Sequence, residues 1–381
     1  MSDSLQLCDD AVWHILPRGM RYERNRPTSI DLFVSEMQAH TRFETIVVAE
    51  SGGPKLPANL VIDLPKFDVA NTFQRARFVA KRVARHKPSI VIVQQHLPSA
   101  AAIASRIMQP TILQKHNFVR APRVGALAAL GRWRHVQQFR KLAGITFVSE
   151  AVQAHFEQHW PEVEIARCVV PNGIDLSAWT PQAERSRFVL VVGRASPDKG
   201  LLEAAKALAV ILPKRPDWSA CFVMSECQRN PAYAAAVRAA LAPIAGQVRV
   251  LESVPASTVK QLNEQAAIAL IPSVWAEPFG RTCLEAHAGG AAVLSSGSGG
   301  LREVSGEHAH YLAGVEPGVM APAIAALMDD DALRISKVEA AHARMRALYD
   351  VGAVAARLDD FIELVGRKAG RRPRLLQNPK S

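Results

Sequence analysis

The sequence has few cysteines, no long apolar run and no basic leader, and each absence excludes a class of protein. Its five cysteines form no C-x-x-C pair and no cluster with histidine at the spacing of metal ligands, so we predict a reducing compartment and no metal site. The most apolar segments, 89–95 and 266–274, have the length of strands rather than of a membrane span. Because Asp3, Asp9 and Asp10 stand where a signal peptide is basic and apolar, we predict no export.

Four common catalytic motifs are also absent. The chain has no G-x-G-x-x-G after its first predicted strand, no G-x-x-x-x-G-K-[ST], no G-x-S-x-G and no H-E-x-x-H. These motifs serve dinucleotide binding, ATP binding, serine nucleophiles and catalytic zinc, respectively. Dehydrogenases, P-loop ATPases, serine hydrolases and zinc proteases therefore lose their signatures.

Short β-like runs alternate with helical stretches along all 381 residues, a pattern typical of parallel sheets covered by helices. Strands are predicted at 12–17, 43–49, 60–64, 89–95, 111–116, 145–149 and 167–171, and again at 187–193, 218–225, 248–253, 268–273 and 291–296. The clearest helices of the first half are predicted at 29–40, 71–85, 125–142 and 150–159. A polar break at 175–187 predicts a linker between two α/β units, with ligands at the carboxyl ends of the strands, in a cleft between the units.

Positive charge is concentrated in the first half of the chain. The formal net charge is +11, and between Asp68 and Glu150 there are 14 Lys and Arg and no acidic residue. This stretch predicts an anionic partner. No nucleic-acid-binding motif accompanies the charge, so we expect no nucleic acid.

The strongest candidate site lies in a strand, turn and helix at 271–304. Glu277 follows the strand, Gly280 permits a close backbone approach, and Arg281 begins a helix whose free N–H groups attract phosphate. Glu285 then lies on the first or second turn, where its carboxylate can accept hydrogen bonds from a diol such as a ribose. Carboxylates inside an otherwise apolar element favour a ligand role over plain surface charge.

A second candidate site lies at 189–205, where a predicted strand ends at Gly193. Arg194 and Lys199 follow on a short loop, and two fixed cations can neutralise a diphosphate without a metal. We expect Lys199→Ala to lower turnover with the fold intact, since a surface cation contributes little stability. Downstream, glycines at 297, 299 and 300 are equally compatible with a tight turn and with a ligand cradle.

The segments 169–181, 192–200 and 272–304 together resemble the consecutive motifs of family-4 glycosyltransferases, which have the GT-B fold. The most recognised feature of that family is Glu, seven residues, Glu, here Glu277 to Glu285. The resemblance implies two Rossmann-like parallel-sheet domains that face a cleft, with a helical C-terminus that crosses back. It implies an acceptor domain at 1–176, a nucleotide-sugar donor domain at 177–349, a helix at 350–366 packed on the first domain, and the tail at 367–381.

The same resemblance implies a role for each motif residue. Arg194 and Lys199 would hold the donor diphosphate, Glu285 the ribose, and Glu277 the hydroxyls of the transferred sugar. Backbone contacts to sugar and phosphate would come from Phe279, Gly280, Arg281 and Thr282. His116, at the end of a predicted strand, resembles a histidine near the transferred sugar and is equally compatible with a structural role.

The loop after the first strand departs from the family pattern. Where the family often has a glycine-rich loop, this chain keeps Gly19 and adds Arg21, Arg24 and Arg26. These arginines leave two interpretations open, contact with the donor or recognition of an anionic acceptor. His96, which follows another predicted strand, is a weaker candidate of the same kind as His116.

We therefore expect a retaining, metal-independent hexosyltransferase that uses a nucleotide-diphosphate sugar, UDP before GDP, and needs no cofactor. In the mechanism implied by the resemblance, the leaving diphosphate assists the incoming hydroxyl on the same face. The acceptor would be a saccharide or a lipid-linked glycan of lipopolysaccharide or another cell-surface polysaccharide, reached by a cytoplasmic protein at the inner face of the membrane. The resemblance further implies an anionic membrane surface as a partner, met through the basic residues of 75–141 and through the basic tail at 367–381. Two alternatives stay open, a nucleotide-sugar epimerase of similar fold and a non-catalytic nucleic-acid or membrane adaptor.

Overall fold

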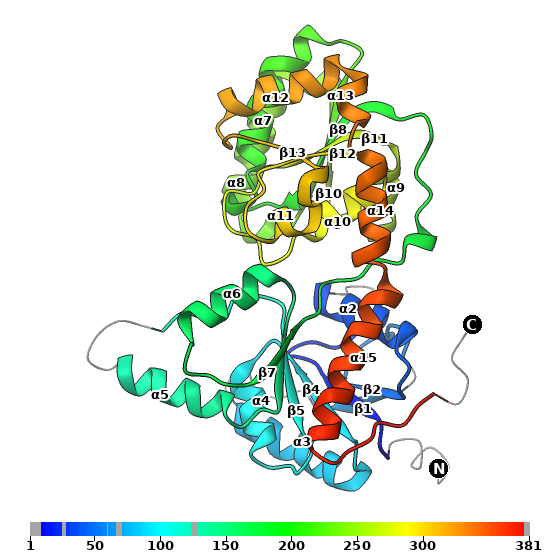
Figure 1. Cartoon of the computed structure of the whole chain (residues 1–381). Helices are drawn as coiled ribbons and strands as arrows, with labels where there is room; N and C mark the ends of the chain where they lie inside the picture. Colours follow the sequence, from blue (N-terminus) through cyan, green and yellow to red (C-terminus); the bar gives the residue numbers. More distant parts are fainter. Residues whose placement is uncertain (1–8, 25–27, 59, 66–70, 123–127, 377–381) are drawn as a thin grey trace. The chain divides into compact units, whose positions relative to one another are not determined.

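The chain forms two compact α/β units (Figure 1). The computed structural model describes residues 9–24, 28–58, 60–65, 71–122 and 128–376. Unit 1 comprises Met1–Gly173 and Val351–Ser381, and unit 2 comprises Ile174–Asp350. The chain therefore passes from one unit to the other twice. Among the described residues, no helix is both long and apolar enough to cross a bilayer.

Unit 1 contains a seven-stranded parallel sheet in the order β3-β2-β1-β4-β5-β6-β7. Its strands are β1 (Val12–Ile15), β2 (Thr45–Glu50), β3 (Val61–Leu64), β4 (Ile90–Gln94), β5 (Thr111–Lys115), β6 (Gly144–Phe147) and β7 (Ala166–Val169). Its helices are α2 (Ser29–His40), α3 (Thr72–His86), α4 (Leu97–Ala104), α5 (Ala128–Phe139), α6 (Glu150–His159) and α15 (Val351–Lys368). All seven strands were predicted from the sequence. The central strands β1 and β4 are buried along their whole length, as expected of a sheet with helices on both faces.

Helix α15 packs beside α2 in unit 1, although more than 300 residues separate them in the sequence (Figure 1). The Asp359 carboxylate accepts hydrogen bonds from the Thr41 hydroxyl at 2.6 Å and from the Arg42 backbone N–H at 2.9 Å. Beyond α15 the chain stays attached to this unit. The backbone N–H of Arg374 donates to the carbonyl of Asp10 at 2.9 Å, and the carbonyl of Arg374 accepts from Glu44 at 2.9 Å. The predicted basic tail is therefore paired with the fold over its described part.

Unit 2 contains a six-stranded parallel sheet in the order β10-β9-β8-β11-β12-β13. Its strands are β8 (Ser186–Arg194), β9 (Ser219–Ser225), β10 (Val248–Glu252), β11 (Ala266–Ile271), β12 (Ala292–Ser295) and β13 (His310–Tyr311). Its helices are α7 (Leu201–Ile211), α8 (Pro231–Leu241), α9 (Ala256–Gln265), α10 (Arg281–Ala288), α11 (Gly300–Ser305), α12 (Pro317–Asp329), α13 (Asp331–Ile335) and α14 (Val338–Leu348). The sequence prediction missed β13, which has only two residues.

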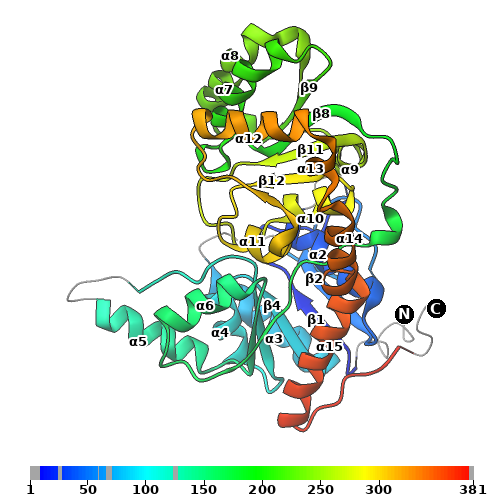
Figure 2. The ribbon, with the colours of Figure 1, turned by 45° about the horizontal axis from the view of Figure 1, so that its top comes forward.

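The two faces of the unit 2 sheet follow from the alternation of side chains along β8. Val189 and Val191 belong to the larger apolar core together with residues of α7, α8 and α12. Phe188 and Leu190 point to the other face, where they pack with Leu262 of α9. Figures 1 and 2 both show α12 beside α7. The sheet is thus covered on both faces by apolar packing.

Candidate active site

The loop after β8 brings Lys199 to the residues that follow β11. Gly200 has a φ of +66°, and a Cβ at this position would lie 2.1 Å from the carbonyl oxygen of Pro272. Only glycine allows this approach. The backbone N–H of Val274 also donates to the carbonyl of Asp198 at 2.9 Å. The two loops are therefore fixed against each other.

Lys199 and Glu277 form an ion pair in this position. The Lys199 Nζ donates to Glu277 Oε1 at 2.5 Å, and the Ser273 hydroxyl donates to the same oxygen at 2.6 Å. The side chains of Lys199 and Glu277 are only 18% and 10% exposed. The expectation that Lys199 is a plain surface cation is wrong, because its charge compensates a carboxylate that has little access to water.

Arg194 occupies the end of β8 and is more exposed than Lys199. Its Nη2 donates to Asp198 Oδ2 at 3.1 Å, and the other carboxylate oxygen of Asp198 accepts from the Ser196 hydroxyl. Arg194 is thus the last residue of β8, one position beyond the predicted strand end, and Lys199 lies on the loop that follows; each is held by a different carboxylate. Sequence reasoning missed the two supporting side chains, Asp198 and Ser273; both are polar residues just past the carboxyl end of a strand.

The glycine run ending at Gly300 has a packing role. The N–H of Gly300 donates to the carbonyl of Glu277 at 2.8 Å, and a Cβ on Gly299 would lie 2.4 Å from that same carbonyl oxygen. A side chain on Gly300 would meet the backbone of Phe279 at 2.6 Å. These glycines therefore let the backbone of 277–279 lie directly against the start of α11. The sequence left a tight turn and a ligand cradle open for them, and these contacts show a packing role for Gly299 and Gly300.

Helix α10 begins at Arg281, directly after Gly280, as predicted. The Phe279 side chain is 3% exposed and packs edge-on to the ring of Tyr349, so Phe279 can offer a ligand only its backbone. The Arg281 Nε donates to Glu285 Oε1 at 2.9 Å, one helical turn away. Thr282 and Glu285 line a small pocket together with Asn263 of α9 and with apolar side chains of β8 and β11.

The predicted residues of unit 1 lie at the carboxyl edge of its own sheet. The His116 Nε2 bonds to Gln94 Oε1 at 2.7 Å, and the Gln94 amide nitrogen donates to Gln114 Oε1 at 3.1 Å. Burial, together with the charge of Lys115, lowers the pKa of His116 to about 3. His116 is therefore a neutral imidazole near pH 7 whose Nε2 carries the proton, since Gln94 Oε1 can only accept.

The loop after β1 is held by a buried carboxylate. Gly19 is exposed, and its backbone N–H donates to Glu50 Oε1 at 2.8 Å. The guanidinium of Arg21 lies 3.5 Å from Glu23 Oε1, while Arg26 lies outside the described residues. The His96 Nδ1 bonds to the Ser99 hydroxyl at 2.8 Å. Gly19 and His116 belong to unit 1, whereas Glu277 and Glu285 belong to unit 2. A cleft that they share therefore stays a prediction.

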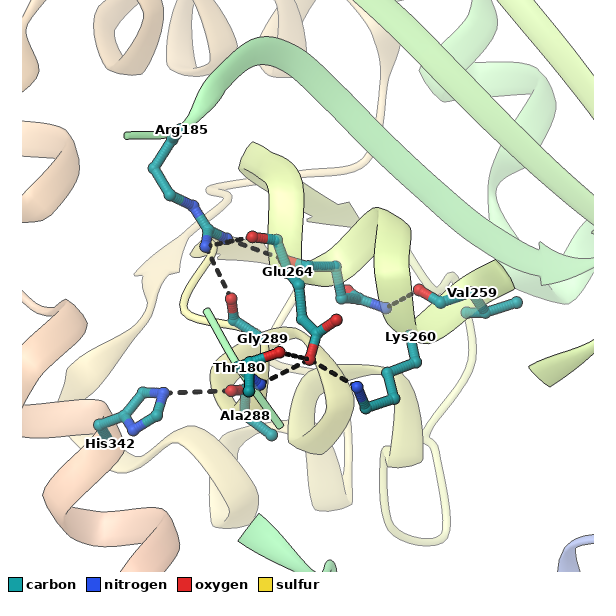
Figure 3. Close-up of polar contacts among 9 residues, drawn as sticks. Thr180, Arg185, Val259, Lys260, Glu264, Ala288, Gly289 and His342 are labelled. Atoms are coloured by element: carbon teal, nitrogen blue, oxygen red, sulfur yellow. Dashed lines mark hydrogen bonds and ion pairs between the residues drawn. The ribbon is translucent and has the colours of Figure 1, made fainter. Parts of the chain in front are cut away.

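The segment predicted as a linker is tightly attached to unit 2 (Figure 3). Arg185 donates hydrogen bonds of 2.7 to 3.0 Å to the carbonyls of Asn263, Glu264, Ala266 and Gly289, at the ends of α9 and α10. Glu264 Oε1 accepts from the Thr180 N–H at 2.6 Å and from the Lys260 Nζ at 2.7 Å. A guanidinium here satisfies carbonyls that a helix end leaves without partners. Composition alone could not reveal this, because the carbonyls are distant in sequence.

Comparison with known proteins finds glycosyltransferases over most of the chain. The family profile "Glycosyltransferase Family 4" matches residues 29–178, and "Glycosyl transferases group 1" matches residues 177–344. Among curated proteins, the putative glycosyltransferase YtcC of Bacillus subtilis is 26% identical over 58% of this chain and 60% of its own length. The D-inositol 3-phosphate glycosyltransferase of Corynebacterium glutamicum is 31% identical over 51% of this chain and 50% of its own length. The chain thus spans about half the length of the curated relatives it matches.

The solved structures show the fold. The Anabaena protein HepE, crystallised in complex with UDP-glucose, superposes with a TM-score of 0.74 over 93% of this chain and 100% of its own, at 16% identity. One family profile matches mainly unit 1 and the other matches unit 2. The Glu277 to Glu285 motif lies within the profile that matches residues 177–344. The chain therefore belongs to the family-4 glycosyltransferases and has their GT-B fold of two Rossmann-like parallel-sheet units.

Proposed function

We propose that the protein is a retaining hexosyltransferase that takes a hexose from a UDP-sugar, without a metal, and passes it to a hydroxyl of a saccharide or lipid-linked acceptor. The observation that carries this proposal is the Lys199–Glu277 pair beside the start of α10, with Glu285 one turn further along the helix. The name of the HepE complex supports UDP as the nucleotide, since that protein was crystallised with UDP-glucose.

The residues present suit the charge changes of such a transfer. The bond between the sugar's anomeric carbon and the diphosphate oxygen breaks, and the acceptor oxygen bonds to the same face of that carbon. The acceptor proton passes to the departing diphosphate. Arg194, Lys199 and the N–H groups at the start of α10 would stabilise the negative charge that develops on the diphosphate. Glu277 would hold sugar hydroxyls, with its own charge balanced by Lys199.

We further propose that the acceptor belongs to lipopolysaccharide or another cell-surface glycan and is met at the inner face of the membrane. Helix α3 supports this proposal, because Arg77 and Lys81 are exposed and line a pocket with Phe73 and Phe78. The Phe73 side chain is 67% exposed. Cations beside an exposed aromatic side chain suit an anionic lipid surface. Arg75 is an exception within this basic stretch, since it is buried.

Binding and product analysis test the proposal. Calorimetric titration with UDP and with GDP, in the presence of EDTA, is expected to show binding of UDP that weakens at least tenfold in Glu285→Ala, because a hydrogen-bonded carboxylate contributes roughly 1.5–3 kcal/mol. Glu307→Ala, at an exposed glutamate of the same unit, is the matched control.

The anomeric proton coupling of the product, followed by NMR, is expected to show the configuration of the donor. An inverted product would refute the retaining mechanism. Conversion of the UDP-sugar to its epimer without any acceptor would instead identify an epimerase, and a cellular role unchanged by Glu277→Gln would identify a non-catalytic adaptor.

A further inference from the structure

Cationic side chains gather where three neighbouring strands of unit 1 end. Arg18 follows β1, His96 follows β4, and Lys115 is the last residue of β5. These strands are adjacent in the sheet, in the order β1-β4-β5. Arg75 reaches the same edge from α3, because its Nη2 donates to the carbonyl of Leu16, just past β1, at 2.7 Å. The carboxyl edge of a parallel sheet is where ligands of α/β proteins bind.

The charges of this cluster act on one another. Burial lowers the pKa of His96, and the charges of Arg18, Lys115 and Arg75 lower it further. Burial also lowers the pKa of Lys115 to about 8. The Lys115 Nζ donates to a neutral group, the carbonyl of Gln95, at 2.9 Å. An anion bound here would favour the charged forms of His96 and Lys115.

The two buried cations, Arg75 and Lys115, have little compensation from the described residues near them. Arg75 is 1% exposed, and its Nε lies 4.0 Å from Glu50 Oε1, an oxygen that already accepts the N–H of Gly19. The Arg75 Nε makes no hydrogen bond among the described residues. A buried donor without an acceptor is costly and requires an explanation.

The backbone at this edge is also strained. Gln95 has a φ of +63°, in the left-handed region that favours glycine. Its N–H donates to the carbonyl of Gln114 at 2.7 Å, and its side-chain Oε1 accepts the backbone N–H of His116 at 2.9 Å. Strained residues held this firmly are concentrated at functional sites. Gln95 thereby connects the cation cluster to His116.

We propose that the cluster of Arg18, Arg75, His96 and Lys115 binds a phosphoryl group of the acceptor. The inference rests on the proposed glycosyl transfer and names a phosphorylated acceptor as its substrate class. Arg18 is partly exposed, whereas Arg75 and Lys115 are buried, and the charges of all three act on His96. A phosphoryl group offers enough oxygens to accept from several donors at once. Unit 2 has its own groups for the donor diphosphate, Arg194 and Lys199.

Titration of the full chain with inorganic phosphate, followed by ³¹P NMR line broadening in saturating UDP, tests the assignment. Saturating UDP occupies the phosphate-binding groups of unit 2. We expect Lys115→Met and Arg18→Gln each to weaken phosphate binding on the order of tenfold. UDP affinity should stay unchanged in both variants. Lys141→Met, at an exposed lysine of the same unit, is the control for loss of one charge.

Two outcomes would overturn the proposal, and a third concerns the donor site alone. Phosphate binding that is absent, or equal in all variants, places no phosphoryl site at this edge. Phosphate that binds through Lys115 but is displaced by UDP assigns the cluster to the donor diphosphate instead. If UDP does not bind the wild-type chain, the donor proposal fails, and the titration without UDP still decides the role of the cluster. Arg18→Gln, on a partly exposed side chain, keeps the test decisive if Lys115→Met does not fold.

Discussion

Replacing Lys199 by methionine separates its electrostatic role from its packing, because methionine keeps most of the aliphatic stem. Glu277 would retain only the Ser273 hydroxyl, at 2.6 Å, as a side-chain partner among the described contacts. Losing one partner of a buried pair costs roughly 3–5 kcal/mol, and the 18% exposure of the Lys199 side chain reduces this to about 2 kcal/mol. In a unit of this size such a loss lowers Tm by about 4–8 °C.

A double-mutant cycle measures the pair directly. Urea unfolding of Lys199→Met, Glu277→Gln and the double variant is expected to give a coupling energy of about 1–3 kcal/mol. Glu277→Gln should restore most of the stability lost in Lys199→Met, because a neutral amide needs no countercharge. Turnover should fall on the order of a hundredfold in all three variants. Lys206→Met, at an exposed lysine on α7, controls for loss of a surface charge.

Two results would refute this reasoning. If Lys199→Met unfolds at the same urea concentration as Lys206→Met, the pair contributes nothing to the fold. If the two single substitutions add within about 0.5 kcal/mol, the residues are not coupled despite the 2.5 Å contact.

Three further predictions concern other parts of the chain. Gly200→Ala should destabilise unit 2 by about 2 kcal/mol or more in urea unfolding, because of the positive φ and the clash of the new Cβ with the Pro272 carbonyl oxygen. Gly246→Ala, where the new Cβ would meet no atom, should be nearly neutral in the same titration. Burial lowers the pKa of His287 to about 3, so between that value and about 6.5 only the unfolded chain binds the proton, and stability should fall as the pH drops. His287→Gln should make the urea midpoint less dependent on pH. An unchanged pH dependence of that midpoint would contradict a neutral buried imidazole. The double substitution of Arg77 and Lys81 by glutamine should weaken co-sedimentation with anionic vesicles by roughly 1 kcal/mol per charge and leave neutral vesicles unaffected; equal binding to anionic vesicles would exclude α3 as the contact.

The strands and the main site residues were predictable because their signals are local. Parallel strands buried on both faces are short apolar runs, and twelve of them were recognised in the sequence. The same holds for the end of β8, followed by Arg194 and Lys199, and for the end of β11, followed by Glu277. In each case the residues that define the site lie within a few positions of the strand that carries them.

Only the tertiary structure decided the contacts between segments that are distant in the sequence. Lys199 meets Glu277 because Gly200 lies against Pro272, and no local pattern encodes that approach. Arg185 was predicted in a linker, yet it joins the ends of α9 and α10. Arg75 lies in a basic run that predicted a surface, yet it is buried and donates to the carbonyl of Leu16, just past β1. The charge pattern of a sequence gives the number of cations, whereas the packing of helices on the sheet decides which of them face water.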